Sequence, residues 1–308
     1  MRIAFMGTPE FAVPILTSLI EKSRHEVVVV VTGCDKPAGR HLRLCSTPVK
    51  MVAESYNLPI LQPDCFTDPL FLERLASYRP DIGVVVAFRI LPEEVYSIPP
   101  LGCVNLHGSL LPELRGAAPI NWAIMRGYTE TGLTTFSIAS KVDTGNILLQ
   151  EKVGILPEDN FDTLAGRMCS VGSELVIQTL NGLEDGLVHP VPQQGKATSA
   201  PKLTRDICLI KWEKPAHHIH NRIRGLAPSP SAFSSLGGKT VKLFSSALWD
   251  SANTAPPGTT TGFADGMILV QTGSGCLGIR ELQLEGKKRM TAVDFIKGYP
   301  LPVGTVWG

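Results

Sequence analysis

Short apolar segments alternate with helical patterns from the beginning of this 308-residue chain. Residues 2–6 and 27–31 are continuous apolar runs of the kind that form buried strands, and the residues between them place their apolar side chains on one helical face. A strand, a helix and a strand in this order predict a parallel sheet. Only Gly7 stands in the first turn, so the glycine-rich fingerprint of dinucleotide-binding sheets is absent.

The same alternation continues to residue 182. Further strands are expected at residues 58–62, 82–87, 102–106, 133–139 and 147–153. Further helices are expected at residues 47–56, 68–78, 117–125 and 160–182, the last of them capped by Asn160. This pattern predicts an α/β domain, with a Rossmann-like and mostly parallel sheet, over residues 1–182.

The composition changes after residue 182. Residues 183–204 are rich in Pro, Gly, Gln and Ser and are expected to form a linker. Residues 205–308 contain one helical pattern near their start and several short strand-like runs, joined by hairpin signals such as Gly237-Gly238 and Asp265-Gly266. Short strands at these intervals predict a second, smaller domain with an OB-like β-barrel, a fold that often binds nucleic acid.

Two polar side chains, those of Asn105 and His107, come from the strand predicted at residues 102–106 and from its end. They are two residues apart, so both point to the same face of the strand. Ligands of open α/β sheets bind at the carboxyl ends of the strands. Asp143 lies in a turn after the next predicted strand, and we expect it to reach the same edge. Together an amide, an imidazole and a carboxylate can move a proton and stabilise an oxyanion, although each alone is more often structural.

The charge of the chain is unevenly distributed. Residues 1–204 carry 17 Lys and Arg against 21 Asp and Glu, a net charge of −4, whereas residues 205–308 carry 12 against 7, a net charge of +5. The asymmetry is consistent with a polyanionic partner for the second domain, or simply with a basic surface. The loop expected at residues 33–50 is also basic, and its Arg40 could reach a phosphate or a base edge.

Cysteine usage and hydropathy indicate a cytoplasmic protein. The seven cysteines are scattered, odd in number and without Cys-x-x-Cys spacing, which is typical of a reducing compartment. No apolar run approaches the roughly 18 residues of a membrane-spanning helix, and the N-terminus lacks a signal-peptide pattern. His217, His218 and His220 lie close together but have no Cys or carboxylate at a familiar ligand spacing, so we expect no metal site.

Six segments of the chain resemble motifs of the methionyl-tRNA formyltransferases, a family within the formyltetrahydrofolate-using formyltransferases. They are Phe5-Met-Gly-Thr-Pro-Glu-Phe11, Lys36-Pro-Ala-Gly-Arg40, Asn105-Leu-His-Gly-Ser-Leu-Leu-Pro112, Arg115-Gly-Ala-Ala-Pro119, Asp143-Thr-Gly145 and Gly286-Lys-Lys-Arg-Met290. Their order and spacing match over essentially the whole chain. The chain departs from the family pattern at Arg89, where relatives usually carry Gly after the aromatic residue, and at Pro228-Ser-Pro230, where relatives often carry Pro-Trp-Pro.

The resemblance implies transfer of a formyl group from 10-formyltetrahydrofolate to the free amino group of methionyl-tRNA(fMet), which yields N-formylmethionyl-tRNA for translation initiation. We expect Asn105 and His107 to donate hydrogen bonds to the formyl oxygen, and Asp143 to orient His107. The resemblance assigns folate binding to Phe88, Arg89, Ile90, Leu91, Ser109, Leu110, Leu111 and Pro112. It assigns tRNA binding to Lys36, Arg40, Arg43, Lys287, Lys288 and Arg289. No metal is implied, and a monomer is expected.

Other classes of protein share some of these features. A formyl-folate enzyme that acts on a small amine, such as an amino sugar, or on water would share the catalytic trio but would not need a basic loop and a basic second domain. A nicotinamide-dependent oxidoreductase would fit the β-α-β start but not the missing glycine fingerprint. A non-catalytic RNA-binding module would leave the placement of Asn105, His107 and Asp143 unexplained.

Overall fold

The computed structural model describes residues 1–38, 43–250 and 254–308, and of Ala38 and Arg43 it describes the backbone alone. The chain forms two compact units. The first unit consists of Met1–Gly116, Thr131–Val153 and Ala165–Ser199, and the second of Ala117–Glu130, Gly154–Leu164 and Ala200–Gly308. Two short segments of the predicted first domain, 117–130 and 154–164, therefore pack with the second unit. The domain boundaries inferred from composition stay a prediction.

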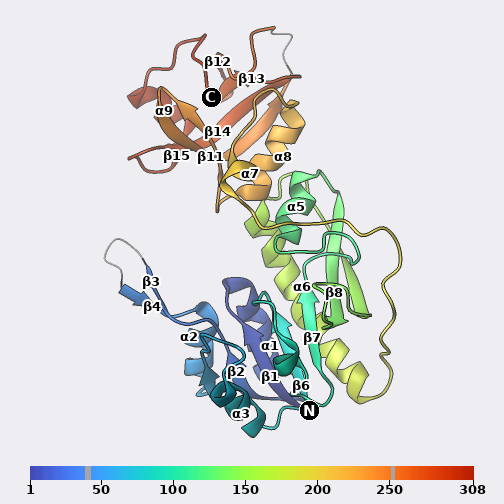
Figure 1. Ribbon diagram of the computed structural model, residues 1–308. Helices are drawn as coiled ribbons and strands as arrows, with labels where there is room; N and C mark the ends of the chain where they lie inside the picture. Colours follow the sequence, from blue (N-terminus) through green and yellow to red (C-terminus); the bar gives the residue numbers. More distant parts are fainter. Residues whose placement is uncertain (39–42, 251–253) are drawn as a thin grey trace. The chain divides into compact units, whose positions relative to one another are not determined.

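The first unit is built on a seven-stranded sheet with the order β5-β2-β1-β6-β7-β8-β9. Its strands are β1 (Arg2–Gly7), β2 (Glu26–Val31), β5 (Ile60–Leu61), β6 (Ile82–Val86), β7 (Cys103–His107), β8 (Glu130–Ser137) and β9 (Ile147–Gly154). The pairs among β5, β2, β1, β6 and β7 are all parallel, whereas β8 runs antiparallel to β7 (Figure 1). The strand β7 therefore lies where the parallel part of the sheet ends.

Helices cover both faces of this sheet. They are η1 (Glu10–Ala12), α1 (Val13–Lys22), α2 (Pro48–Ser55), α3 (Pro69–Ser77), α4 (Glu93–Tyr96) and α6 (Phe161–Glu184). On one face, Phe71 of α3 and Val95 of α4 belong to a core cluster that includes Cys103 of β7. On the other face, Gly172 of α6 lies against Leu106 of β7. Residues 103 and 106 point to opposite faces of a strand, so the centre of the sheet is closed to water on both sides.

Local signals set several helix starts. The side chain of Thr47 accepts a hydrogen bond from the backbone of Lys50 at α2, and that of Asp68 accepts one from Leu70 at α3. Proline occupies the first position of both helices, where its missing N–H costs nothing. Asn160 Oδ1 accepts from the backbone N–H of Thr163 at 3.0 Å, so the predicted cap of α6 is confirmed.

The second unit has an antiparallel sheet of its own, with the order β10-β11-β14-β13-β12 and β15 paired to β14. Its strands are β10 (Ala232–Leu236), β11 (Lys239–Trp249), β12 (Thr260–Ala264), β13 (Met267–Gln271), β14 (Cys276–Leu284) and β15 (Met290–Thr291). Its helices are α5 (Pro119–Met125), α7 (Arg205–Cys208), α8 (Ala216–Leu226) and α9 (Ala292–Gly298). The predicted fold class is confirmed: a Rossmann-like, mostly parallel sheet is followed by a smaller β domain.

The second unit has a core of its own, and α5 is part of this unit. Trp212 and Trp307 pack edge to face with ring centroids 6.0 Å apart inside a cluster of buried aliphatic side chains. Asn121 of α5 is buried, and its Nδ2 donates to the carbonyl oxygen of Gly225 in α8 at 2.8 Å. This buried hydrogen bond links residues that are 104 positions apart in the chain. Helical periodicity identifies each helix but cannot show that the two helices pack together.

The loop expected at residues 33–50 contains structure that the sequence did not indicate. Residues Lys36–Ala38 form β3 and Arg43–Cys45 form β4, which pair as an antiparallel ribbon. The Nζ of Lys50 lies 2.5 Å from Asp35 Oδ2, so this lysine forms an ion pair with an acidic residue of the same segment. Other differences are small: β5 is two residues long, and the helix expected from residue 117 begins at Pro119.

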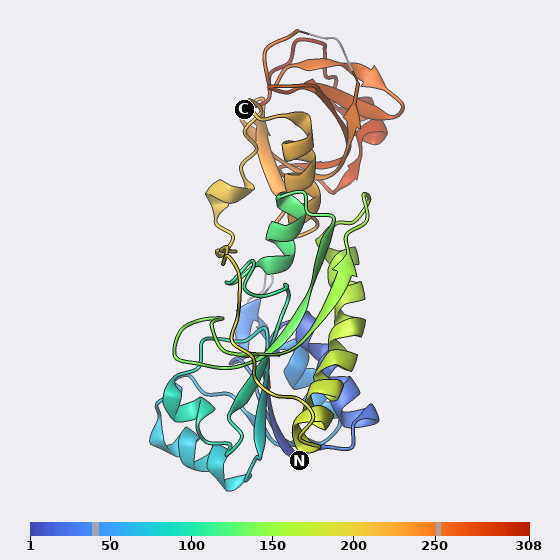
Figure 2. The same ribbon diagram turned by 90° about the vertical axis from the view of Figure 1, so that its right-hand side faces the viewer.

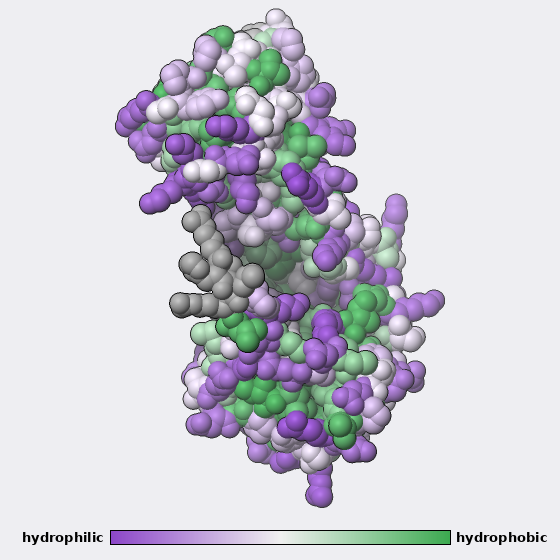
Figure 3. All heavy atoms as spheres, turned by 60° about the vertical axis from the view of Figure 1, so that its left-hand side comes forward, coloured by the Kyte–Doolittle hydropathy of each residue, from purple (hydrophilic) through white to green (hydrophobic). Residues whose placement is uncertain are grey.

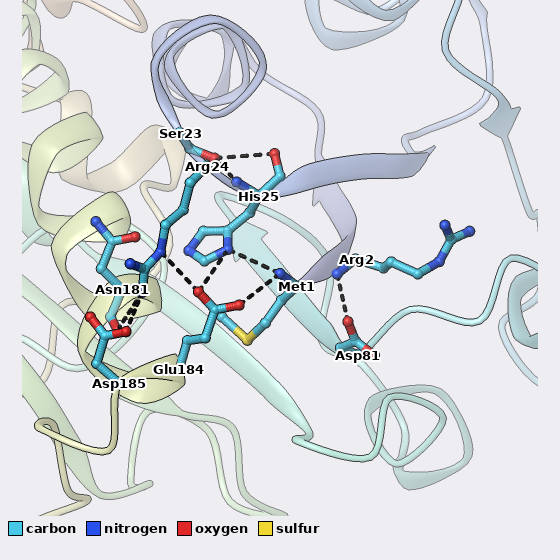
Figure 4. Close-up of polar contacts among 9 residues, drawn as sticks. All are labelled: Met1, Arg2, Ser23, Arg24, His25, Asp81, Asn181, Glu184 and Asp185. Carbon is cyan, nitrogen blue, oxygen red and sulfur yellow. Dashed lines mark hydrogen bonds and ion pairs between the residues drawn. The ribbon is translucent and has the colours of Figure 1, made fainter.

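A polar cluster joins the first strands of the sheet to the end of α6 (Figure 4). The ammonium group of Met1 lies 3.1 Å from His25 Nδ1 and 3.1 Å from Glu184 Oε1. Arg24 pairs with Glu184 at 2.8 Å and with Asp185 at 2.5 Å. The hydrogen bond to the Met1 ammonium is the main cause that holds the pKa of Glu184 below its ordinary value. The long helix is thus fixed to the sheet at the end remote from Asn160.

The face of the molecule shown in Figure 3 is mostly polar. Hydrophilic side chains are spread over the face shown in Figure 3, and apolar side chains gather there only in small patches. In Figure 2 the long helix α6 runs beside the strands of the first unit and covers much of their length. Within the described parts of the chain, no helix has both the length and the apolar character that crossing a membrane requires.

Candidate active site

His107 is the last residue of β7, and its side chain is buried. Its Nε2 lies 3.0 Å from the carbonyl oxygen of Leu114. A carbonyl oxygen can only accept a hydrogen bond, so in the neutral imidazole the proton belongs on Nε2 and Nδ1 carries a lone pair. Phe136 of β8 packs edge-on against the ring, with centroids 6.4 Å apart, and helps to hold the ring plane.

Asp143 places a carboxylate beside the free nitrogen of this imidazole. Its Oδ2 lies 3.9 Å from His107 Nδ1, which is beyond direct hydrogen-bond distance, and accepts a hydrogen bond from the backbone N–H of Gly116 at 2.8 Å. Burial lowers the pKa of His107 below its ordinary value of 6.5, and the charge of Asp143 opposes this shift only in part. The imidazole is therefore neutral at pH 7 and can take up a proton at Nδ1, next to a charge that stabilises the product.

Asn105 lies two residues before His107 on the same strand, opposite Val85 of β6 and Phe136 of β8. Its side chain is half-buried, and within residues 1–38, 43–250 and 254–308 its amide has no hydrogen-bond partner. Most amides in such positions are paired. An amide with unused donors at the carboxyl end of a central strand is available to a ligand.

The loop between His107 and Leu114 is shaped by hydrogen bonds within the loop and to β8. Ser109 is fully buried, and its hydroxyl donates to the carbonyl oxygen of Glu113 at 2.5 Å. Thr134 of β8 donates to the carbonyl oxygen of Ser109 at 2.7 Å and accepts from the backbone N–H of Leu111 at 3.0 Å. These bonds fold the loop back so that Leu114 reaches His107. Among the folate-binding residues predicted here, Ser109 and Leu111 are buried, whereas Leu110 and Pro112 are partly exposed.

The second predicted folate-binding segment, Phe88 to Leu91, follows β6, the parallel neighbour of β7. Leu91 is buried in the core and Ile90 is 74 % exposed. The guanidinium of Arg89 lies 4.2 Å from the centroid of the Phe66 ring, and its Nη2 donates to the carbonyl oxygen of Pro63 at 2.7 Å. The arginine that departs from the family pattern therefore attaches this segment to the neighbouring loop.

The predicted tRNA-binding cations have different environments. Lys36 is exposed on β3, whereas Arg40 lies outside the described residues and only the backbone of Arg43 is described. Lys287 and Lys288 are exposed in the turn between β14 and β15. Arg289 already has partners within the protein. It forms an ion pair with Glu281, and its guanidinium carbon lies 4.5 Å from the centroid of the Phe244 ring.

Two site features escaped the sequence analysis. One is the backbone of Leu114 and Gly116, which contacts His107 and Asp143 although neither residue type signals such a role. The other is the segment expected to be a linker, whose Gln193 donates to the carbonyl oxygens of Asp143 and Gly145. Composition describes this segment correctly as polar and proline-rich, but it gives no sign of these contacts.

The three histidines of the second unit were expected not to bind a metal. The structure brings no three or more His, Cys, Asp and Glu side chains together as a metal site in the part of the chain that it describes. His220 Nδ1 lies 3.0 Å from Ser246 Oγ, and burial lowers the pKa of this histidine to about 4. His220 is thus a neutral, hydrogen-bonded residue of the packing between α8 and β11.

Comparisons with known proteins agree with this geometry over the length of the chain. Residues 1–180 match the family described as formyl transferase, and residues 202–300 match the formyl transferase C-terminal domain. The chain is 44 % identical over 308 residues to a methionyl-tRNA formyltransferase of Syntrophus aciditrophicus, covering 99 % of this chain and 98 % of the relative. It is 45 % identical over 303 residues to one of Chlorobium chlorochromatii, covering 97 % and 96 %.

Solved structures share the fold at lower sequence identity. HypX from Aquifex aeolicus in complex with tetrahydrofolic acid superposes with a TM-score of 0.68 at 19 % identity, covering 98 % of this chain and 48 % of that one. A methionyl-tRNA formyltransferase from Clostridium thermocellum gives 0.57 at 16 % identity, covering 92 % and 98 %. The full-length sequence identity and both family matches lead to one conclusion: the chain belongs to the methionyl-tRNA formyltransferase family.

Proposed function

We propose that this protein transfers the formyl group of 10-formyltetrahydrofolate to the free amino group of methionyl-tRNA(fMet) and so produces N-formylmethionyl-tRNA for translation initiation. The observation that carries the proposal is the 44 % identity to a relative of that name along both units, and not along the catalytic part alone. The proposal is supported by Asn105 and His107 on β7, with Asp143 from the turn after β8 beside them, because such groups can carry out the chemistry that this transfer needs. Such a reaction would take place in the cytoplasm, and we propose that the protein acts there as a monomer.

The reaction places specific demands on the site. The amine nitrogen forms a bond to the formyl carbon, charge grows on the formyl oxygen, and the bond from that carbon to the folate nitrogen then breaks. The amine nitrogen loses one proton and the departing folate nitrogen gains one. The net change in protonation is therefore the transfer of one proton from the first nitrogen to the second. A neutral proton acceptor and a hydrogen-bond donor for the oxygen are therefore required.

The side chains divide between these two demands. Asn105 has unused amide donors, and we assign it as the hydrogen-bond donor to the formyl oxygen. The expectation that His107 donates to the same oxygen fits this conformation less well, because the one proton of the neutral ring is bonded to Leu114. We assign His107 Nδ1 as the acceptor of the amine proton, which it can pass to the folate nitrogen. Asp143 then stabilises the imidazolium for as long as it exists.

The loops that follow β7 and β6 suit a flat heterocycle. Leu110 and Pro112 offer partly exposed apolar surface in the loop after β7, and Phe88 is partly exposed after β6. We assign these two segments to binding of the pterin.

For contacts with the tRNA phosphates we keep the exposed Lys36, Lys287 and Lys288, together with Arg40 and Arg43. Arg289 is a weaker choice, because Glu281 already neutralises it.

The direct test is incubation with 10-formyltetrahydrofolate and charged initiator tRNA, followed by mass analysis of the amino-acid end. We expect formylated methionine to accumulate, and we expect amino sugars and water to be poor acceptors under the same conditions. Efficient formylation of a small amine in place of the tRNA, or release of formate alone, would contradict the proposal and favour an enzyme for small substrates.

Removal of the Asn105 amide should slow the chemical step. We expect Asn105→Ala to reduce kcat by about 10²–10³, the usual effect of deleting one oxyanion donor, with little change in KM. Asn146→Ala is a matched control, because Asn146 is exposed in the nearby turn and should show wild-type rates. Near-normal kcat in Asn105→Ala would remove this residue from the catalytic group.

The pKa of His107 should depend on Asp143. Burial lowers this pKa and the carboxylate partly raises it again, so loss of the charge should lower it further. We expect the ring of His107 to titrate below 6.5 in the wild type and at a still lower pH in Asp143→Asn, as followed by NMR with assignment through His107→Gln. A midpoint above 6.5, or one that does not move in Asp143→Asn, would be inconsistent with this electrostatic pairing.

Binding of tRNA should depend on salt through the exposed lysines. We expect Lys287→Ala to weaken tRNA binding and to reduce the slope of log affinity against log salt by about 1, because one phosphate contact is lost. Lys22→Ala, an exposed lysine at the end of α1, serves as the control for a simple change in net charge. Equal slopes in the two variants would exclude the β14–β15 turn from the tRNA surface.

A further inference from the structure

The segment between the two family matches is more than a connector. The backbone N–H of Val191 donates to the carbonyl oxygen of Ile147 at 2.8 Å, and that of Ile147 donates back to Val191 at 2.8 Å. Further along, the backbone N–H of Arg115 donates to the carbonyl oxygen of Thr198 at 2.9 Å. Residues 191–198 therefore run past both loops that carry the active site, and all of them belong to the first unit.

Gln193 joins these two loops through its side-chain amide. Its Oε1 accepts from Arg115 Nε at 3.1 Å and from Arg115 Nη2 at 2.6 Å. Its Nε2 donates to the carbonyl oxygens of Asp143 at 3.0 Å and Gly145 at 2.8 Å. The guanidinium can only donate and the carbonyls can only accept, so the orientation of the amide is determined by its partners. Both of its N–H groups and both of its lone pairs are in use.

The residues held in this way have an unfavourable backbone conformation. Asp143 has φ +53° and Leu114 has φ +57°, in the left-handed region that most side chains with a Cβ avoid and that Asp tolerates better than Leu. Such residues persist only where their surroundings enforce the conformation. Gln193 bonds the carbonyl oxygen of Asp143, and Thr198 Oγ1 accepts from the backbone N–H of Leu114 at 2.9 Å. Each of the two disfavoured residues thus has its own contact from the same segment.

These two residues also determine the catalytic geometry. Leu114 supplies the carbonyl oxygen that fixes the tautomer of His107, and the same peptide unit donates its N–H, that of Arg115, to Thr198. Asp143 supplies the carboxylate 3.9 Å from His107 Nδ1. No direct hydrogen bond joins that carboxylate to the imidazole, so their separation depends on the loops that carry them.

The geometry points to Gln193 and Thr198 as positioning residues for formyl transfer. They hold Asp143 and Leu114 in the conformations that set the carboxylate and the carbonyl oxygen around His107. This inference rests on the proposed function, and it gives a segment outside both family matches a part in the chemistry. A displacement of about 1 Å at a reacting group can cost about 10²-fold in rate, so the contacts matter even though neither residue meets the substrate.

The test compares two adjacent glutamines. We expect Gln193→Ala to reduce kcat by about 10- to 100-fold with KM for both substrates within about twofold, because binding surfaces are untouched and only geometry is lost. Gln194→Ala removes the same side chain from an exposed neighbouring position and should match the wild type. Equal kcat in the two variants, or a Gln193→Ala defect confined to KM for tRNA, would overturn the inference.

Thr198 provides an independent variant in case Gln193→Ala folds poorly. Thr198→Val keeps the shape and removes the acceptor for Leu114, and we expect kcat to fall about 10-fold, whereas Thr198→Ser restores the hydroxyl and should recover most of the rate. A Thr198→Ser variant as slow as Thr198→Val would contradict a role of the hydroxyl. The titration of His107 distinguishes positioning from a general loss of stability, since withdrawal of Asp143 should lower its pKa in Gln193→Ala.

The inference and the proposed function fail in different ways. If the wild-type protein forms no formylmethionyl-tRNA, the proposed function is wrong whatever the variants do. If the wild type is active and Gln193→Ala, Thr198→Val and Gln194→Ala are all equally active, the function stands and the positioning role is wrong.

Discussion

The hydrogen bond from His107 Nε2 to the carbonyl oxygen of Leu114 fixes the geometry of the candidate active site. It assigns the proton of a neutral, buried imidazole to one nitrogen and leaves the other free beside Asp143. Without it the ring could present an N–H to the formyl oxygen, and the roles of His107 and Asn105 would be interchangeable. With it the roles that we propose for the two residues are distinct, His107 as proton acceptor and Asn105 as hydrogen-bond donor to the oxyanion.

The fold provides this hydrogen bond by combining a strand in the middle of the sheet with two loops that are braced by a third segment. β7 fixes Asn105 and His107 through its ladders to β6 and β8. The loops that carry Leu114 and Asp143 contain left-handed residues, and Gln193 and Thr198 contact both loops from outside. Residues 191–198 are therefore built into the first unit, where they contact both of these loops.

Much of the fold and part of the site could be predicted from the sequence. The alternation of apolar runs and helical patterns gave the parallel sheet, and the two-residue spacing of Asn105 and His107 placed both on one face of a strand. Asp143 was found because a turn after a strand returns to the same edge. These inferences depend on local periodicity, which a single sequence records directly.

The remaining features depend on contacts that periodicity does not encode. Leu114 acts through its backbone, so its side chain carries no signal of the role. Gln193 and Asp143 are 50 positions apart, and a glutamine in a polar segment looks the same whether it is solvated or fully bonded. Residues 117–130 pack with the second unit for a similar reason. Asn121 forms a hydrogen bond with Gly225, a distant residue that local periodicity does not identify.

The protonation state of His107 can be read from the ¹⁵N chemical shifts of its ring in the intact protein at pH 7, and it decides between the proposed roles of His107 and Asn105. We expect a neutral ring with its proton on Nε2 and an unprotonated Nδ1. A ring protonated on Nδ1, either as the other neutral tautomer or as an imidazolium, would contradict this expectation and return His107 to the role of a hydrogen-bond donor.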